Sequence, residues 1–474
     1  MTEGTRLSAR NPRTGEADFD FVSPSPAALA ATATALRDGQ RRWRAMTVER
    51  RSEFLGLWRD EVARRREPLF EALSADTGRR AIARQEIDAF LQMIDRWRKE
   101  APALLAASEA PSRVFPHITI RAEAEPYPLV AAISPWNFPL LLAFIDAIPA
   151  LLAGAAVFVK PSEVTPRFVG PLNETIAAVP ELSSVLAVAA GDGAAGAALI
   201  SLVDAVAFTG SVATGRKVAE ACAKAFIPAF LELGGKDPAI VLDGADVERA
   251  ATAILRASVV STGQACQSIE RVYVARTIFE PFLARLVEKA VATRLAVEPG
   301  GVLGPLIFER QAQIIADHLT EAVAKGAVIH CGGSIERHGG GYWIGPTVIT
   351  DVTHEMKVMT EETFGPVIPV MPFETVEDAV RLANDTIYGL SAAVFAGSEN
   401  EALAVARRLE AGGVSINDAG LTTMVFEAQK SGFKLSGIGP SRMGASGLTR
   451  FLRHKAIYIN RGPALPIVAF AETD

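Results

Sequence analysis

Short apolar runs recur through the middle of the chain, each bounded by Gly, Pro or Asp and followed by a stretch of helical length. They occupy residues 129–134, 155–159, 185–190, 205–208 and 238–242. Runs this short and apolar are typical of strands buried on both faces, and the intervening lengths suit crossover helices. The alternation predicts βαβ units on a parallel sheet. A second series predicts another α/β unit after about residue 235, with strands at 270–275, 328–333 and 366–373.

The flanking segments carry different patterns. Residues 26–107 space their apolar side chains three and four apart, which indicates amphipathic helices. Thr47 precedes one of them, but Arg50 stands where a capping box requires Glu or Gln. Residues 113–128 alternate like a strand and could form a hairpin that leaves the main body, and residues 454–470 also indicate strand. No repeat or low-complexity linker separates these segments, so we expect closely packed units.

One stretch challenges a globular interpretation. From Leu129 to Val159 the only ionisable residue is Asp146, and the stretch is long enough to span a bilayer. Three prolines interrupt it, however, and a carboxylate near its middle would be costly in lipid. Buried strands and helices of an α/β core explain it better than a membrane span.

Composition narrows the function classes. The 474 residues carry 48 Lys and Arg against 54 Asp and Glu, a net charge of −6, so no basic footprint for nucleic acid exists. Three cysteines cannot form a disulfide framework, and the first residues show no apolar signal segment, which predicts a reducing, cytoplasmic location. The six histidines form no zinc-ligand spacing with the cysteines, so we expect no catalytic metal.

Two glycine-rich turns could bind a nucleotide. The turn at 191–196, with Gly191, Gly193 and Gly196, fits G-x-G-x-x-G after an apolar run, but no acidic residue follows about twenty positions later. A tight strand-to-helix turn explains it as well. A second turn places Gly210, Ser211 and Gly215 after the run at 205–208, where backbone N–H groups could approach a pyrophosphate. The pair supports a nucleotide site without deciding which turn carries it.

Three polar residues stand out as candidates for chemistry. Cys266 follows a glycine-containing turn among polar neighbours, whereas Cys222 and Cys331 fit the usual role of a cysteine as a small buried hydrophobe. Glu232 is an isolated carboxylate in an apolar run and could serve as a general base or merely pair with a cation. Asn137 lies between aromatic residues and prolines, where its amide could polarise an oxyanion or stabilise a turn.

Seven motifs in order resemble the NAD(P)-dependent aldehyde dehydrogenase superfamily. The resemblance covers the chain from residue 11 to about 457 and includes the thirty-four-residue spacing from Glu232 to Cys266. The motifs are NPRTGE (11–16), PWNFP (135–139), KPSE (160–163), FTGS (208–211), LELGGK (231–236), GQAC (263–266) and EETFGP (361–366).

The resemblance implies the catalytic roles. Cys266 matches the nucleophile that attacks the aldehyde carbon, and Asn137 with the backbone N–H of Cys266 matches the oxyanion hole. Glu232 matches the base that activates water to hydrolyse the thioester. Its presence argues against the CoA-acylating branch of the superfamily, where this glutamate is typically absent.

The resemblance also implies a nicotinamide cofactor. Lys160 and Glu163 match residues that hold the adenosine ribose, and a carboxylate there disfavours a 2′-phosphate, so we expect NAD, with NADP possible. Gly193 then belongs to a neighbouring wall of the adenine pocket. The remaining implied positions lie at the pyrophosphate (Trp136, Gly210, Ser211, Gly215) and at the nicotinamide ribose and ring (Glu362, Phe364).

Three departures concern the substrate. Asp146 stands where many members carry lysine, in a region we expect near the active-site entrance, and residues 440–442 replace the more usual acidic residue after the SGxG turn. The loop 418–433 departs from the common glycine- and proline-rich version. With no obvious arginine anchor, Phe138, Met424 and Phe426 are expected to line a site for a hydrophobic aliphatic or aromatic aldehyde.

The resemblance implies an α/β architecture of three parts. We expect a Rossmann-like NAD(P)-binding domain (1–107 and 127–234), an α/β catalytic domain (235–450) and a small β oligomerisation element (108–126 and 451–474). An exposed edge in that element needs a partner strand, which predicts a homodimer or homotetramer. Two other functions stay open: a thiol esterase that uses the same residues without redox chemistry, and a non-catalytic binding member of the fold.

Overall fold

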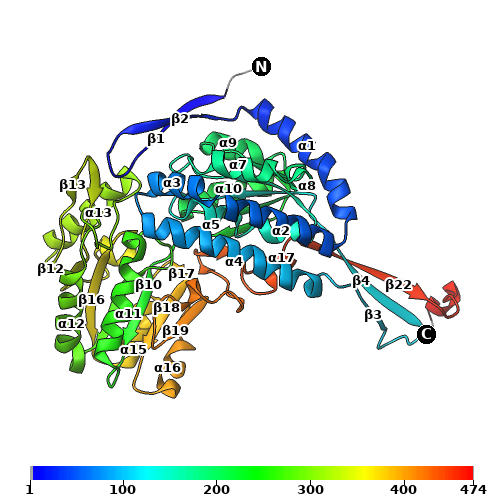
Figure 1. Cartoon of the computed structure of the whole chain (residues 1–474). Helices are drawn as coiled ribbons and strands as arrows, with labels where there is room; N and C mark the ends of the chain where they lie inside the picture. Colours follow the sequence, from blue (N-terminus) through cyan, green and yellow to red (C-terminus); the bar gives the residue numbers. More distant parts are fainter. Residues whose placement is uncertain (1–3, 473–474) are drawn as a thin grey trace.

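Two large sheets side by side and a small projecting sheet make up the protein (Figure 1). The computed structural model describes residues 4–472. The chain starts with a hairpin of β1 (Thr5–Arg10) and β2 (Ala17–Ser23) that runs over the top of the molecule toward the second sheet (Figure 1). The expected α/β class is confirmed, and both large sheets are mainly parallel with one antiparallel edge strand each.

The first large sheet has six strands in the order β21-β9-β8-β5-β6-β7, and all but β21 run parallel. Its strands are β5 (Leu129–Ile133), β6 (Ala156–Lys160), β7 (Leu186–Val188), β8 (Ala205–Thr209), β9 (Ala229–Glu232) and β21 (Gly437–Ile438). The connecting helices are α5 (Pro139–Phe144), α6 (Ala147–Ala153), α7 (Val169–Ala177), α8 (Pro180–Ser183), α9 (Gly193–Ile200) and α10 (Val212–Ala225). β21 joins this sheet although the sequence boundaries place it with the second unit, because the chain returns to pair with β9.

Four N-terminal helices complete the first layer, as the periodicity predicts. They are α1 (Pro26–Ala45), α2 (Val48–Arg64), α3 (Arg66–Thr77) and α4 (Arg80–Leu104). Thr47 caps α2 by accepting the N–H of Arg50 at 3.3 Å, without the reciprocal half of a capping box. Trp58 packs edge-on against Phe90 at 5.3 Å and also contacts Phe144, so α2, α4 and α5 share one aromatic core.

The second large sheet has seven strands in the order β12-β15-β16-β11-β10-β18-β19, with β12 antiparallel. The strands are β10 (Asp237–Val241), β11 (Ile269–Ala275), β12 (Val328–Cys331), β15 (Thr347–Thr350), β16 (Val367–Phe373), β18 (Ser391–Phe395) and β19 (Gly413–Ile416). Both faces are covered, because Ile240 belongs to one apolar cluster and its neighbours Ala239 and Val241 to the other. The main helices are α11 (Val247–Val259), α12 (Phe279–Ala292), α13 (Glu309–Ala324), α15 (Val376–Asn384) and α16 (Glu399–Ala406).

Shorter elements join these layers. The two-stranded pairs are β13 (Glu336–His338) with β14 (Gly341–Trp343), and β17 (Tyr388–Gly389) with β20 (Phe433–Lys434). The remaining helical segments are η1 (Val260–Gly263), η2 (Arg276–Ile278), α14 (Lys357–Thr360), η3 (Leu421–Thr423), α17 (Ser446–Thr449) and η4 (Ile467–Phe470).

The small sheet extends away from the body (Figure 1). It consists of β3 (Ser108–Pro111), β4 (Ile118–Pro126) and β22 (Leu452–Asn460), all antiparallel. The predicted hairpin exists, with its first strand five residues earlier than the start of the alternating segment. The strand predicted over 454–470 is confirmed as far as Asn460, where it pairs along β4, but it is wrong for residues 467–470, which form the 3₁₀ segment η4. The segment Leu129–Val159 forms β5, α5, α6 and β6, and within residues 4–472 no helix is both long and apolar enough to cross a membrane.

Candidate active site

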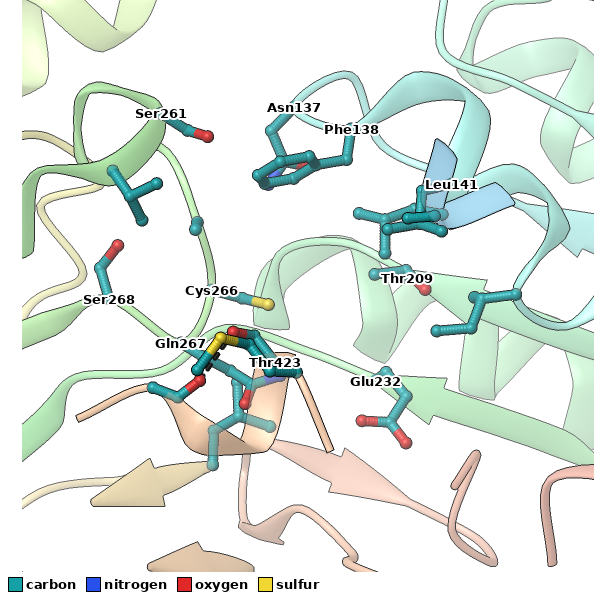
Figure 2. Close-up of a pocket in the computed structure, with 18 of the residues that line it drawn as sticks. Asn137, Phe138, Leu141, Thr209, Glu232, Ser261, Cys266, Gln267, Ser268 and Thr423 are labelled. Atoms are coloured by element: carbon teal, nitrogen blue, oxygen red, sulfur yellow. Dashed lines mark hydrogen bonds between the residues drawn. The ribbon is translucent and has the colours of Figure 1, made fainter. Parts of the chain in front are cut away.

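The two large sheets meet where the chain passes directly from β9 to β10 through Leu233–Lys236. The carboxyl end of β9 therefore points at the amino end of β10, and loops from both sheets enclose a cavity of about 370 Å³. Asn137, Glu232 and Cys266 all line this cavity. Figure 2 shows Cys266 between Asn137 on one side and Glu232 on the other. Three residues that are far apart in the sequence are thus gathered around one space.

Cys266 lies in the loop between η1 and β11, and that loop has an unusual backbone. Ser261, Thr262 and Gly263 all have positive φ angles, of 57°, 59° and 68°. A Cβ at Gly263 would lie 2.2 Å from the carbonyl carbon of Gly365, so only glycine fits there. Two consecutive non-glycine residues in the left-handed region persist only where their surroundings hold them, as at many functional sites.

The Cys266 residue is half-buried in a cavity wall. Burial raises its pKa to about 11, and the charge of Glu362 acts in the same direction. The cations Lys430 and Arg442 oppose the shift. Because the thiolate is the reactive form, these two cations favour a nucleophilic state of Cys266.

The Asn137 amide is held by the loop of Cys266. Its Nδ2 donates one hydrogen bond to the carbonyl of Gln264 at 2.9 Å, which leaves the second N–H of the amide available to the cavity. Gln264 is itself tied down, since its side chain bonds the carbonyls of Ser261 and Pro305 and the N–H of Ile307. The donor is therefore preorganised beside the thiol.

A buried arginine that the sequence analysis missed clamps both loops. Arg79 donates to the carbonyl of Asn137 and, at 3.1 Å, to the carbonyl of Ser261. Burial lowers its pKa to about 10. Arg79 lies in the predicted helical region, just before α4, and nothing in its local sequence distinguishes it from the other arginines there.

A second missed residue, Glu86 on α4, fixes the helix that follows Asn137. One of its carboxylate oxygens accepts the N–H groups of Leu140 and Leu141, at 2.8 and 2.9 Å. Burial raises the pKa of Glu86 to about 7. The carboxylate thus caps the start of α5 from inside the cavity wall.

Glu232 is the last residue of β9, with its side chain in the cavity. Its carbonyl accepts the N–H of Gly210, which ties it to the end of the neighbouring strand β8. The nearest cation is Arg442, whose Nε lies 3.8 Å from Oε1 of Glu232. The carboxylate can therefore face the cavity without being locked in a short ion pair.

The residues expected to line the substrate site, Phe138, Met424 and Phe426, all reach the cavity. Met424 is 56% exposed, which places it at the rim, whereas Phe426 is half-buried against the first core. Phe426 also lies under the guanidinium of Arg96, 5.3 Å from the ring centre. Apolar side chains of α5 and its flanks, among them Leu141, form the remaining wall.

Cationic side chains also line the cavity, and the expectation of no arginine anchor stays a prediction. Arg256 and Arg442 are both paired, Arg256 with Asp418 and Arg442 with Asp146. Lys430 is different: its ammonium group makes no hydrogen bond or ion pair with any residue in the range 4–472. The sequence shows that residue 430 is a lysine. That its side chain reaches the cavity depends on how the loop folds.

Two other sequence expectations need correction. Asp146 does not lie at an entrance, since the residue is 2% exposed. A carboxylate can be buried there because it accepts hydrogen bonds from the buried Arg442 and Arg450. Cys331 is only partly buried, on the edge strand β12, while Cys222 is buried as expected.

The expected ribose-binding residues lie at the carboxyl end of β6. Lys160 donates to the carbonyls of Pro161 and Gly191, which brings the glycine-rich turn against this strand. Glu163 follows two residues after Pro161, and its charge favours the protonated form of Lys160, whereas burial lowers the pKa of that lysine. Gly193 begins α9, two residues after Gly191, and the Cβ position of Gly196 in the same helix lies 3.5 Å from the Lys160 side chain. Lys160 therefore contacts the glycine-rich turn that contains Gly193, and Glu163 acts on Lys160 by its charge.

The expected pyrophosphate turn lies at the carboxyl end of β8. Ser211 caps α10 by accepting the N–H of Thr214 at 3.3 Å, and the first turn of this helix is largely exposed. A Cβ at Gly215 would lie 2.5 Å from a methyl carbon of Leu233, and one at Gly210 would lie 2.5 Å from the ring of Phe208. Small residues therefore let an exposed helix N-terminus sit close to the sheet edge, which suits an anionic group.

The expected nicotinamide residues come from the loop before β16. Trp136 packs edge-on against Phe364 at 5.4 Å, and Oε1 of Glu362 accepts the N–H of Gly235 at 3.1 Å. Burial raises the pKa of Glu362 to about 8. The buried carboxylate of Glu270 accepts the N–H groups of residues 363 and 364, both at 2.8 Å, and so fixes the loop.

None of the nine expected cofactor residues lines the cavity. Most follow the carboxyl ends of the parallel strands β5, β6 and β8, the edge at which open α/β sheets bind nucleotides. The arrangement therefore separates a nucleotide edge from a cavity that holds a thiol, an amide and a carboxylate. Fold and site together define a class: α/β proteins in which a cavity with a thiol, an amide and a carboxylate lies next to the sheet edge at which such folds bind nucleotides.

Comparison with known proteins identifies the family. A sequence profile described as the aldehyde dehydrogenase family matches residues 1–457. A relative from Mycolicibacterium smegmatis, provisionally named succinate-semialdehyde dehydrogenase [NADP(+)], is 37% identical over 438 residues, which are 91% of this chain and 84% of the relative. Betaine aldehyde dehydrogenase of Cereibacter sphaeroides (strain ATCC 17029) is 36% identical over 466 residues, 97% of this chain and 95% of the relative.

Solved structures agree with the sequence matches. A provisionally named aldehyde dehydrogenase, PutA, from Anabaena variabilis has a TM-score of 0.96 and 56% identity, and covers 98% of this chain and 99% of its own. Betaine aldehyde dehydrogenase from Staphylococcus aureus in complex with NAD+ has a TM-score of 0.91 and 31% identity, over 97% and 92% of the two chains. The chain belongs to the aldehyde dehydrogenase family and is an NAD(P)-dependent oxidoreductase.

Proposed function

We propose that the protein oxidises an aldehyde to its carboxylic acid through a covalent intermediate on Cys266. The observation that carries the proposal is the meeting of Cys266, Asn137 and Glu232 in one cavity beside a nucleotide-binding sheet edge. A thiol, an oxyanion donor and a base are the groups that acyl chemistry at a carbonyl requires.

Each residue has a defined task. The thiolate of Cys266 attacks the aldehyde carbon, and the free N–H of Asn137 with the backbone N–H of Cys266 stabilises the negative oxygen that results. When bound, the nicotinamide ring supplies the hydride acceptor that turns this adduct into a thioester on Cys266. Glu232 then takes a proton from water, whose oxygen bonds the acyl carbon while the carbon–sulfur bond breaks. A base in the cavity supports hydrolysis over transfer to coenzyme A.

The proposed cofactor is NAD, with NADP possible. Lys160 and Glu163 hold the adenosine ribose in this proposal, Gly193 borders the adenine, Ser211 with Gly210, Gly215 and Trp136 surrounds the pyrophosphate, and Glu362 and Phe364 contact the nicotinamide ribose and ring. Glu163 would repel a 2′-phosphate, so replacing it by serine is expected to raise kcat/KM for NADP relative to NAD. An unchanged ratio in steady-state assays would remove Glu163 from the explanation.

The proposed substrate is a hydrophobic aliphatic or aromatic aldehyde. Phe138, Leu141 and Phe426 form an apolar wall close to Cys266, and Met424 extends it to the rim. Burying an apolar tail of this kind is worth about 25 cal/mol per Å². The names of the relatives refer to several different aldehydes, so the proposed substrate class rests on the side chains that line the cavity.

Lys430 favours a second candidate, a short aldehyde that carries a carboxylate. Its unpartnered ammonium faces the same cavity and would pair with an anionic substrate tail. Hexanal, benzaldehyde and succinic semialdehyde separate the two candidates. A much higher kcat/KM for succinic semialdehyde, lost in Lys430→Met, would replace the hydrophobic aldehyde by the anionic one.

Assembly and location complete the proposal. The small sheet leaves the edge of β22 open and exposes apolar groups such as Tyr458, which is 69% exposed. We expect this edge to pair with another copy in a homodimer or homotetramer. The free thiols of all three cysteines are consistent with a reducing compartment, the cytoplasm.

The decisive experiment follows absorbance of reduced nicotinamide with purified protein, NAD+ or NADP+, and the aldehyde panel. Wild type runs beside Cys266→Ala and Glu232→Gln. We expect turnover by wild type, none by the cysteine variant and a single burst by the glutamate variant. Ester hydrolysis without any nicotinamide reduction would support the thiol esterase instead, and nucleotide binding without either reaction would support a binding role.

A further inference from the structure

Four charged side chains form a buried cluster under the cavity. Asp146 lies between α5 and α6, Arg442 and Arg450 flank α17, and Glu232 ends β9. Asp146 accepts a hydrogen bond from Arg442 at 3.0 Å through one oxygen and from Arg450 through the other. Two cations and two anions balance each other, so the cluster carries no net charge where water is largely excluded.

Arg442 and Glu232 both line the cavity, and Arg442 connects Glu232 to the rest of the cluster. One terminal nitrogen donates both to Asp146 and to the hydroxyl of Thr209 at the end of β8. Its Nε is buried and has no hydrogen-bond partner within residues 4–472, and it lies 3.8 Å from Oε1 of Glu232. Asp146 and Thr209 therefore fix the guanidinium in a position from which its free N–H can engage Glu232.

The two positions that depart from the family pattern are thus in contact. Asp146 and the segment 440–442, which contains Arg442, were both marked in the sequence as departures from the family pattern, and Arg442 lies 296 positions after Asp146. In this chain the positive end of the pair is the one that faces Glu232.

We propose that Arg442 is a positioning residue for thioester hydrolysis, which holds the carboxylate of Glu232 toward the cavity floor while Asp146 and Arg450 hold Arg442. The proposal rests on the proposed function, because Glu232 must be the base. At 3.8 Å the attraction orients Glu232 without a short hydrogen bond, so the carboxylate can still accept a proton from water. The acylation half of the reaction does not use Glu232 and should be little affected.

The test compares the two halves of the reaction in Arg442→Met. A misplacement of about 1 Å at a reacting group can cost roughly 100-fold. We expect the burst of reduced nicotinamide to keep its amplitude while steady-state turnover falls by about 10- to 100-fold. Intact-protein mass spectrometry should then detect the acyl adduct on Cys266 during turnover. A parallel fall of burst and steady state, or no fall in either, would overturn the proposal.

Two further variants separate positioning from stability. Arg442→Lys keeps the charge next to Asp146 and should restore part of the steady-state rate; no difference from the methionine variant in a folded protein would contradict positioning by charge. If Arg442→Met does not fold, the test rests on Arg442→Lys, which lacks the Nε group. A ratio of burst amplitude to steady-state rate equal to that of wild type would then refute the role of Nε. Arg51→Met is the matched control, since Arg51 is 7% exposed like Arg442 but bonds the carbonyls of Met46 and Leu152 away from the cavity.

Failure of the inference differs from failure of the proposed function. If Glu232→Gln accumulates the acyl adduct and Arg442→Met does not, only the role of Arg442 falls. If Glu232→Gln turns over like wild type, Glu232 is not the base and both proposals fall together.

Discussion

Replacing Asn137 by alanine removes the side-chain donor proposed for the oxyanion hole. In the structure its Nδ2 uses one N–H on the carbonyl of Gln264, at 2.9 Å, and keeps the other for the cavity. Losing one of two preorganised donors typically costs about 2.7–4 kcal/mol of transition-state stabilisation. We therefore expect the burst rate constant to fall roughly 100- to 1000-fold at saturating aldehyde.

The same substitution should reduce the stability of the folded protein much less than it reduces the burst rate. Asn137→Ala leaves the buried carbonyl of Gln264 without this donor, which costs about 1–3 kcal/mol, so the unfolding temperature should fall only by several degrees. Stopped-flow absorbance measures the burst, and thermal unfolding monitored by circular dichroism measures stability. Asn137→Asp serves as a control of nearly equal size, and its added carboxylate should slow the burst at least as much, since it repels the oxyanion.

The outcome that would refute this reasoning is a burst rate within about threefold of wild type for folded Asn137→Ala. The backbone N–H of Cys266 would then suffice, and the preorganisation of Asn137 by Gln264 would serve the fold alone.

Further predictions concern the thiol, the cavity wall and a buried ion pair. Because burial raises the pKa of Cys266 to about 11, alkylation by iodoacetamide should accelerate roughly tenfold per pH unit between pH 7 and 9; a plateau in that range would contradict the assignment. Phe426→Ala should raise KM for hexanal more than Met424→Ala does, since Met424 is 56% exposed, and equal effects in steady-state assays would argue against the apolar wall. Lys236→Met leaves the buried Glu270 without its partner at 2.6 Å and should destabilise folding by about 3–5 kcal/mol in urea unfolding, with partial recovery on adding Glu270→Gln; a wild-type midpoint would show that the pair contributes little.

The strands and the catalytic candidates were predictable because their signals are local. The apolar runs that became β5, β6, β8 and β11 are buried on both faces, so the sequence shows them without reference to partners. Cys266 stood out locally by its polar neighbours, and the resemblance to the family, which includes its spacing from Glu232, assigned it the expected role. The structure brings it into one cavity with Asn137 and Glu232, and their chemical roles remain predictions to be tested.

The sequence did not predict which sheet the shortest strands join. β21 has two residues and pairs with β9, more than two hundred positions earlier, so no periodicity identifies it. The first strand of the projecting hairpin, β3, has only four residues, all of them exposed, so its sequence gives no signal of burial.

The sequence by itself determined the class of fold and the kinds of chemical group available, because burial pattern and residue type are properties of single segments. Only the tertiary structure decided which charges meet. In the structure Arg79 donates a hydrogen bond to the carbonyl of Asn137, and Lys430 lines the cavity. Asp146, which was expected near an entrance, is buried and paired with Arg442. Such contacts join side chains as far as 296 positions apart, and their strength depends on distance and dielectric surroundings, which no local pattern encodes.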